Sequence, residues 1–482
     1  MATLTTEYAY DAAGNRTKLV YPSGDTVYYA YDSVNRLERI YNDSDDKAAY
    51  YRYDATGNIT REIKANNTIT YYEYDGAGRL ARLQNVKSDN SLISSFQYDR
   101  DKAGNITKCY RGDGATVYYE YDRAQRLASE VWKDSGMSEI YSFKYDYDGV
   151  GNRSKMLRNL GGGAESTYYY YDAANRLEKE WNETAGTTTY FGYDDNGSVL
   201  RIQTPTGTTY FSYNDNDLVK QVVHEGGGAC GFRYDGRNQR VVVEDSDGTA
   251  YFQWDGLDPV EERDASGGLT AKYVHGFTGI AGIGSLTYMK QGVNCLVPHK
   301  DNTGSIRELS DDSEDVVKYY EYDAFGTKLK ESGNQVNRFQ FSANYMQLKV
   351  LENIYLSPTR VYHAGIGRFL QKDRIRFGAP YTYVTNQPTK YVDPAGLQKE
   401  PTVGENVGIT WDNGDGTKSS AWGRLVESAN EYIIIQKSDG TYITVCREWI
   451  ADGPHWMPST TCLLYTSPSP RDLSTSRMPS SA

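Results

Sequence analysis

Histidines, cysteines and clustered carboxylates are the residues of this sequence that could do chemistry, so we first consider their spacing. The five histidines lie too far apart for a metal-binding motif: His224, His275, His299, His363 and His455. The five cysteines show neither paired spacing nor the density of a disulfide framework: Cys109, Cys230, Cys295, Cys446 and Cys462. We therefore expect no metal site and no cofactor.

The glycine-rich and acidic stretches give equally little sign of a ligand. GGGAES (161–166) and GGGACG (226–231) lack the strand before and the helix after that a phosphate-binding loop requires. WDNGDGTK (411–418) lacks the ligand spacing of a calcium-binding EF-hand loop. We interpret all three as loops.

Charge and hydropathy exclude two classes of partner. The formal net charge is -12 and the pI is near 5.1, so there is no basic surface for nucleic acid. No apolar run approaches the roughly 18 residues that a membrane span needs, and the first residues do not read as a signal peptide. We expect neither a nucleic-acid partner nor a membrane span.

Two carboxylates near the carboxyl end, Asp373 and Asp393, remain as candidates. Asp393 opens the sequence Asp-Pro-Ala-Gly, which is a good type I turn, and Asp373 has Lys372 and Arg374 beside it as ion-pair partners. These structural roles and a catalytic role are both open from the residues alone.

The elements that must position these carboxylates come from a repeat. The chain contains 45 tyrosines, and a Tyr-Asp pair followed by a small, amide-rich turn recurs about every 20 to 25 residues. Full copies begin at Tyr10, Tyr31, Tyr53, Tyr74, Tyr121, Tyr171 and Tyr234, and variants begin at Tyr98, Tyr147, Tyr193 and Trp254. The repeats therefore run to about residue 260.

Each repeat reads as one β-hairpin. Residues 16–21, 26–31 and 36–41 have the β-branched and aromatic character of strands, and the residues between them have turn chemistry. In the run STYYYYDAANRL, Tyr169 and Tyr171 should face one side of the sheet and Tyr168 and Tyr170 the other. We expect the hydroxyls to suit a wet face, and the aspartate to end the strand in an Asx-type turn.

These motifs resemble the Rhs or YD repeats of bacterial polymorphic toxins, Tc toxin C subunits and animal teneurins. The resemblance covers residues 1–397. It implies an all-β fold in which antiparallel hairpins wind into a spiralling sheet that forms a hollow shell, here a partial one. Residues 1–260 would be the shell wall.

Residues 261–397 resemble the Rhs repeat-associated core. The match rests on WDGLDPVEERD, HKDNTGSIREL, YYEYDAFGTKL, GRFLQKD and, most strongly, PYTYVTNQPTKYVDPAGL. In that family the core seals the shell and an aspartyl protease activity cuts the chain after the Leu of DPxGL. The resemblance therefore implies autoproteolysis after Leu397, with Asp373 and Asp393 as acid and base.

Arg368, Pro394 and Gly396 would support these carboxylates, and Arg368 could instead be structural. This chain has Asp373-Arg374 where the family usually has Asp-Pro, which alters the expected local geometry.

The last part of the chain gives two further expectations. Residues 398–461 read as four or five short strands, the start of a variable carboxyl-terminal effector that we expect to be cut off near residue 461. Residues 462–482 resemble a translated sequencing adapter. The chain also begins inside a repeat, so we expect missing repeats at the amino end as well.

Two functions are consistent with these features of the sequence. The first is a fragment of a secreted or cell-surface bacterial toxin whose shell encloses its own effector, with secretion machinery or an immunity protein as further partners. The alternative is an adhesion or carbohydrate-binding protein that binds cell-surface glycan through its aromatic faces and lacks protease activity.

Overall fold

The computed structural model describes residues 5–44, 47–276, 285–342, 346–347, 352–373, 380–393, 400–401, 406–412, 418–428, 432–436, 442–446 and 466–467. Its main element is a 30-stranded antiparallel sheet in which each strand pairs with the next strand of the sequence. The strands are β1 (Glu7–Tyr10), β2 (Arg16–Val20), β3 (Thr26–Tyr31), β4 (Leu37–Asn42), β5 (Ala48–Tyr53), β6 (Ile59–Ile63), β7 (Ile69–Tyr74), β8 (Leu80–Val86), β9 (Leu92–Arg100), β10 (Ile106–Arg111), β11 (Thr116–Tyr121), β12 (Leu127–Lys133), β13 (Glu139–Tyr147), β14 (Arg153–Asn159), β15 (Ala164–Tyr171), β16 (Leu177–Asn182), β17 (Thr187–Tyr193), β18 (Val199–Thr204), β19 (Gly207–Tyr213), β20 (Val219–His224), β21 (Ala229–Tyr234), β22 (Arg240–Asp245), β23 (Gly248–Asp255), β24 (Asp258–Arg263), β25 (Leu269–Gly276), β26 (Ser285–Gln291), β27 (Asn294–Lys300), β28 (Ile306–Ser310), β29 (Val316–Tyr322) and β30 (Lys328–Ser332).

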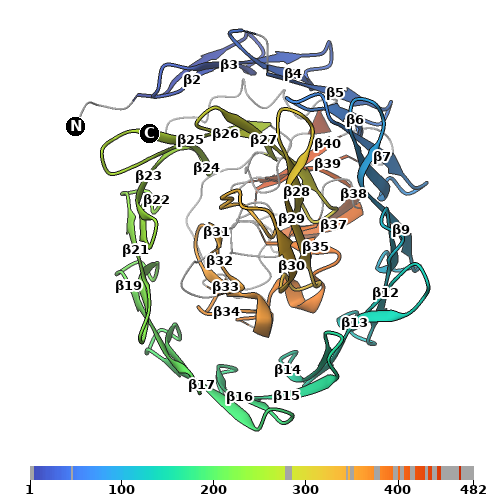
Figure 1. Ribbon diagram of the computed structural model, residues 1–482. Coiled ribbons are helices and arrows are strands. Elements are labelled where there is room, and N and C mark those ends of the chain that lie inside the picture. Colours follow the sequence, from blue (N-terminus) through green and yellow to red (C-terminus); the bar gives the residue numbers. More distant parts are fainter. Residues whose placement is uncertain are drawn as a thin grey trace.

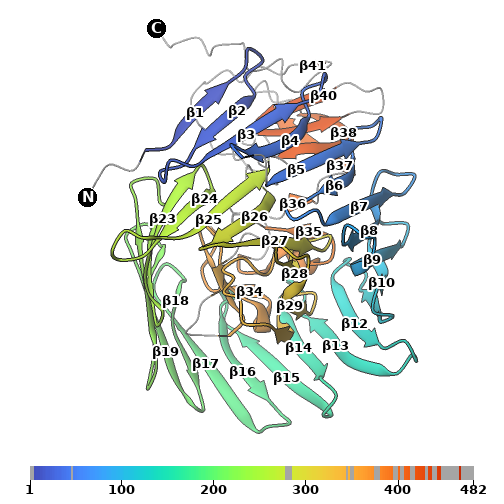
Figure 2. The ribbon, with the colours of Figure 1, turned by 45° about the horizontal axis from the view of Figure 1, so that its top comes forward.

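The sheet curls into a wall that surrounds its own last strands (Figure 1). We call β1–β23 the outer wall and the described residues of 258–393 the inner segment, which lies within the curve of the wall in both views (Figure 2). Side chains join the two layers where the sheet overlaps itself: the Tyr21 hydroxyl donates to the Tyr273 carbonyl at 3.0 Å, and Lys272 pairs with Asp25 at 2.7 Å. Within the described residues, β1 and β30 each pair on one side only, so the sheet does not close on itself. The all-β spiralling fold is thus confirmed.

The aspartate of each Tyr-Asp pair ends its strand in the expected Asx turn. In the turn after β15, one carboxylate oxygen of Asp172 accepts the backbone N–H of Ala174 and of Arg176, both at 2.9 Å, and the other oxygen accepts the Arg176 side chain. The residue before Arg176, Asn175, has φ of 61°, and glycine takes this left-handed position in other repeats, such as Gly151 with φ of 95°. The repeats with glycine at this position and those with asparagine therefore form the same turn.

The tyrosine before the aspartate has a more specific role than the sequence indicated. This residue lies where the strand register shifts. In most repeats its hydroxyl donates to a backbone carbonyl at the start of the preceding strand, at 2.6–3.0 Å, whereas in the Tyr98 repeat Arg100 donates to the Leu80 carbonyl instead. The same bond occurs at Tyr213, which Asn214 follows in place of the aspartate: its hydroxyl donates to the Val199 carbonyl, just beyond the β18–β19 ladder that begins at Arg201. The same bond joins Tyr31 to Arg16, Tyr53 to Leu37, Tyr74 to Ile59, Tyr121 to Ile106, Tyr147 to Leu127, Tyr171 to Arg153, Tyr193 to Leu177 and Tyr234 to Val219, with the indole of Trp254 donating to Arg240.

This hydrogen bond corrects our expectation that these hydroxyls suit a wet face. The carbonyl that accepts it has no strand partner on that side, and an unpaired buried carbonyl is costly. Tyrosine reaches it with an aromatic body that also fills the core. The other tyrosines of a run alternate as expected, since Tyr169 is 5% exposed and Tyr170 is 41% exposed.

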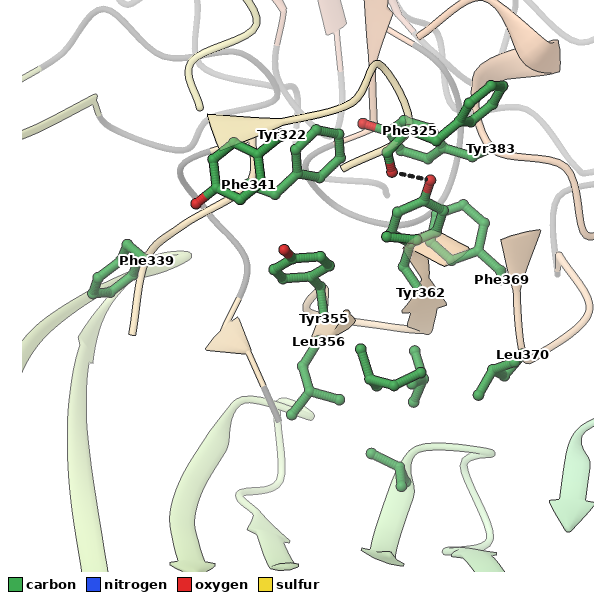
Figure 3. Close-up of a cluster of buried hydrophobic side chains, with 14 of the residues drawn as sticks. Tyr322, Phe325, Phe339, Phe341, Tyr355, Leu356, Tyr362, Phe369, Leu370 and Tyr383 are labelled. Carbon is green, nitrogen blue, oxygen red and sulfur yellow. Dashed lines mark hydrogen bonds between the residues drawn. The ribbon is translucent and has the colours of Figure 1, made fainter. Parts of the chain in front are cut away.

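The inner segment ends in short elements around an aromatic core. They are β31 (Met346–Gln347), β32 (Ile354–Leu356), β33 (Val361–His363), the 3-10 helix η1 (Ala364–Ile366), β34 (Arg368–Phe369), the 3-10 helix η2 (Val384–Asn386) and β35 (Tyr391–Val392), and β35 pairs with β36 (Glu400–Pro401) beyond the segment. Figure 3 shows the aromatic rings that they bring together. The Tyr362 and Tyr383 ring centroids lie 4.5 Å apart, and the buried Tyr362 hydroxyl donates to the Phe325 carbonyl at 2.6 Å. Aromatic rings thus form a large part of this core, beside aliphatic side chains such as Leu356 and Leu370.

The inner segment is fastened to the turns of the wall. It contacts four successive turns, three that follow a Tyr-Asp pair and one that follows Tyr213-Asn214: Asn386 donates to Gly151, Arg368 to Asn152 and Asn175, Tyr381 to Gly197, and Gln371 to Asp217, at 2.5–2.8 Å. Backbone carbonyls accept most of these bonds. The turns therefore both end the wall strands and hold the inner segment in place.

A separate sheet follows the inner segment. It contains β37 (Asn406–Asp412), β38 (Lys418–Ser428), β39 (Tyr432–Gln436), β40 (Tyr442–Cys446) and β41 (Thr466–Ser467), each paired antiparallel with the next. The short strands expected in residues 398–461 are confirmed. The proposed boundaries at residues 260, 397 and 461 stay predictions, and the main sheet continues beyond residue 260 to β30.

Substitution of Tyr213 by Phe tests the tyrosine–carbonyl bond. The change keeps the ring and leaves the Val199 carbonyl without its donor, so we expect a loss of about 1–3 kcal/mol of stability. Thermal unfolding measures it, with Tyr190→Phe as the control because Tyr190 is 51% exposed. Equal midpoints for the two variants would show that the buried bond contributes nothing.

Gly197→Ala tests the docking of the inner segment, with Gly57→Ala as a matched control. Both glycines have φ of 88° in equivalent turns, but a Cβ at Gly197 would lie 2.5 Å from the Tyr381 hydroxyl while a Cβ at Gly57 would meet nothing within 4 Å. Both variants should lose about 1–3 kcal/mol through backbone strain. Only Gly197→Ala should also make the inner segment more sensitive to limited proteolysis, and equal sensitivity of the two would contradict the docking.

Candidate functional site

The two candidate carboxylates come from different parts of the inner segment. Asp373 follows β34, and its backbone N–H donates to the Pro380 carbonyl at 2.8 Å. Asp393 directly follows β35. Arg360 directly precedes β33, where a tight turn holds it: Ser357 Oγ accepts the Arg360 N–H and donates to the Arg360 carbonyl, both at 2.9 Å. The fold brings these three side chains to one place.

Arg360 joins the two carboxylates. Its Nη2 atom lies 3.0 Å from Asp393 Oδ2 and 3.1 Å from Asp373 Oδ2. Both distances are measured from the same nitrogen. The two carboxylate oxygens therefore cannot be farther apart than the sum of these two distances. The sequence-predicted pair, Asp373 and Asp393, is therefore placed together.

The three side chains are secluded from water. The exposed fractions are 6% for the Arg360 side chain, 3% for Asp393 and 13% for Asp373. The Arg360 guanidinium carbon also lies 3.6 Å from the centroid of the Phe369 ring, which fixes the cation on one face. Charge pairs of this burial interact strongly, and removal of one member leaves the others uncompensated.

The positions of the two carboxylates and the guanidinium determine which reactions this site could catalyse. Two close carboxylates can act as acid and base when they share one proton. A guanidinium between them instead favours the state in which both are ionised. General acid catalysis by this pair therefore requires the Arg360 contact to one carboxylate to loosen so that this carboxylate can take up a proton.

The other predicted site residues have different positions. Arg368 is 3% exposed and donates to Asn152 Oδ1 at 2.8 Å and to the Asn175 carbonyl at 2.7 Å. These contacts are with the wall turns, in keeping with the structural alternative. Leu397, Pro394 and Gly396 lie outside the described residues, as does Arg374, one of the two alternative partners for Asp373.

Sequence reasoning missed Arg360. The sequence feature that could have identified Arg360 is its position between a Ser-Pro-Thr turn and an apolar strand. A buried arginine at such a position needs an anionic partner. Gln371 was also missed: its side chain accepts the Val361 N–H at 2.6 Å and donates to the Asp217 carbonyl at 2.5 Å. Gln371 thereby ties the strand that begins after Arg360 to the outer wall.

No group of His, Cys, Asp and Glu that could hold a metal ion occurs among the described residues. In the same part of the chain, no helix is both long and apolar enough to cross a lipid bilayer.

Comparisons with known proteins agree with the repeat. Residues 53–89 match the family model RHS Repeat, and this range runs from the end of β5 to just past β8. No curated protein sequence matches the chain.

Solved structures of similar fold include TcdB2-TccC3 without its hypervariable C-terminal region, with 16% identity and a TM-score of 0.47 over 82% of this chain and 25% of that one. A second is the Photorhabdus luminescens Tc holotoxin pore with a mutated TccC3, with 15% identity and a TM-score of 0.43 over 86% of this chain and 28% of that one. The chain thus spans about a quarter of the length of these solved chains. The Tyr-Asp hairpins and the matched repeat show that the chain carries Rhs/YD repeats.

Proposed function

We propose that this chain belongs to an Rhs-type toxin whose β-shell encloses a carboxyl-terminal effector, and that its inner segment cuts the chain after Leu397. The observation that carries the proposal is the buried group of Asp373, Arg360 and Asp393. It lies on the layer that the wall surrounds, and Asp393 precedes Leu397 by only four residues. Such a protein would act outside the cell or at its surface, with secretion machinery and an immunity protein as further partners.

The proposed reaction is hydrolysis of the bond between Leu397 and Gln398. One carboxylate takes a proton from water as the water oxygen bonds to the Leu397 carbonyl carbon. The C–N bond then breaks, and the other carboxylate, in its protonated form, gives its proton to the leaving nitrogen. The products are a carboxylate on Leu397 and a free amino group on Gln398, with one water consumed.

The role of Arg360 in this proposal is to position the carboxylates. Arg360 holds the two carboxylates close to each other, and its positive charge compensates their negative charges in a site with little water. Release of one carboxylate would provide the acid while the guanidinium still holds the base. The anchors of Gln371 and Arg368 on the wall turns would keep the site rigid during this step.

Substitution of Asp393 by Asn tests the catalytic assignment. Asn keeps the size of the side chain and cannot take part in proton transfer as a carboxylate does, so we expect the intact mass of the full chain to persist while the wild type yields two pieces. The control is Asp215→Asn, because Asp215 is an exposed aspartate of a wall turn. Wild-type cleavage in the Asp393 variant would refute its catalytic role.

Arg360→Lys tests the positioning role. Lysine retains the charge and loses the planar guanidinium, and loss of one charge-assisted hydrogen bond of about 1.5 kcal/mol corresponds to roughly tenfold slower cleavage. The rate of fragment appearance measures this, and a thermal unfolding curve shows whether the variant is folded. A folded variant with the wild-type rate would contradict the role.

The protein samples of the cleavage experiments also test the adhesion alternative. It stays a prediction, and the exposed outer tyrosines Tyr170, Tyr190 and Tyr210 are the residues that it would use. A folded chain that remains intact and binds a glycan array would favour this alternative over the toxin proposal.

A further inference from the structure

Two buried carboxylates meet where the outer wall touches the last hairpin of the main sheet. Glu130 on β12 is 0% exposed, and Asp323, which follows β29, is 6% exposed. Glu130 Oε1 accepts the indole N–H of Trp132 at 2.7 Å, and its Oε2 accepts the backbone N–H of Ala324 at 2.9 Å. The second bond joins the wall directly to the turn between β29 and β30.

Two arginines, Arg307 and Arg153, lie near this pair of carboxylates. Within the described ranges neither Glu130 nor Asp323 forms an ion pair. Arg307 instead donates to Asp301 at 2.7 Å, and Arg153 lies 4.5 Å from the centroid of the Tyr145 ring and 4.4 Å from that of Phe325, so the two arginines only partly offset the negative charges of the pair. The other titratable groups that face the pair are the tyrosines of the surrounding strands: Tyr119, Tyr121, Tyr145, Tyr355 and Tyr362.

Burial without an ion pair favours the protonated forms. Burial, followed by the charge of Asp323, raises the pKa of Glu130 from 4.5 to about 8. Burial raises the pKa of Asp323 from 3.8 to about 6. Because the two groups interact, they lose their protons as a pair between these limits.

We propose that Glu130 and Asp323 form a proton-dependent latch that fastens the β29–β30 hairpin to the outer wall. With one carboxylate protonated, only one negative charge remains at the site and the Ala324 N–H bond stays in place. With both ionised, two buried negative charges repel each other without an ion pair to either, and the hairpin loosens. This device goes beyond the proposed cleavage and does not depend on it.

The sign of the pH dependence follows from the two raised pKa values. A group whose pKa is higher in the folded state stabilises the fold below its unfolded value and loses that contribution as the pH rises through the folded value. The latch is therefore strongest below about pH 4 and is lost by about pH 8.

Water can reach the latch through a small hollow between the two layers. Asp323 and Ala324 line it together with Arg307, Tyr98 and Trp132. It has space for only a few water molecules, so it suits exchange of protons better than binding of a ligand.

Other buried groups titrate in the same pH range. The test therefore compares the pH dependence of the wild type with that of a variant. Burial raises the pKa of Glu308 to about 7, and burial lowers that of Lys300 to about 7. These two groups act in opposite directions on stability as the pH rises. A variant that alters only the latch leaves both contributions unchanged.

Hydrogen exchange of the full chain measures the latch locally. Protection of the peptide that contains Ala324 is compared at about pH 6 and about pH 8.5, after correction for intrinsic exchange. Asp323→Asn removes the charge and keeps the Oδ1 atom that accepts the Thr327 N–H at 2.8 Å. We expect the wild type to lose about tenfold more protection with rising pH than this variant.

Two further variants complete the experiment. Glu178→Gln, at an exposed position, should behave as the wild type. Glu130→Gln should also flatten the pH dependence and serves if Asp323→Asn does not fold, although it sacrifices one of the two N–H bonds. Equal loss of protection in the wild type and the folded latch variants would overturn the proposal.

Discussion

A backbone carbonyl at the start of each repeat strand needs a hydrogen-bond donor, and the rest of the structure depends on how it finds one. The register shift before each turn leaves this carbonyl past the end of its ladder. The hydroxyl of the tyrosine before the aspartate supplies the donor in most repeats, as Tyr193 does for Leu177. One side chain thus completes the hydrogen bonding, fills the core and joins its own strand to the start of the strand before it.

The same feature explains how a chain with few aliphatic residues builds a double layer. The shifted register ends each strand in a short turn whose aspartate satisfies the local backbone, as Asp172 does. Turn carbonyls such as those of Asn175 and Gly197 are then available to the inner segment, which docks on them through Arg368 and Tyr381. The inner segment in turn carries Arg360, Asp373 and Asp393, so the candidate site depends on contacts made far away in sequence.

Local features of the fold could be predicted from the sequence, and long-range ones could not. The strand near Thr26–Tyr31 and the left-handed position of Asn175 follow from propensity and turn chemistry. The pairing of Asp373 with Asp393 came from the family resemblance, and Arg360 was missed because nothing local shows that its partners lie 13 and 33 residues later. The tyrosine hydroxyls were assigned to a wet face because the register shift that exposes a carbonyl is a property of three strands together.

A repeated hydrogen bond thus supports, through the wall and the inner segment, a site where the chain could cut itself, and the central claim is hydrolysis after Leu397. The most direct measurement is mass spectrometry of the chain expressed and incubated in water enriched in oxygen-18. We predict a carboxyl-terminal piece that begins with a free amino group at Gln398, and an amino-terminal piece that carries one oxygen-18 atom in the new Leu397 carboxylate. A folded chain that stays whole, or one that is cut at another bond, would contradict this claim.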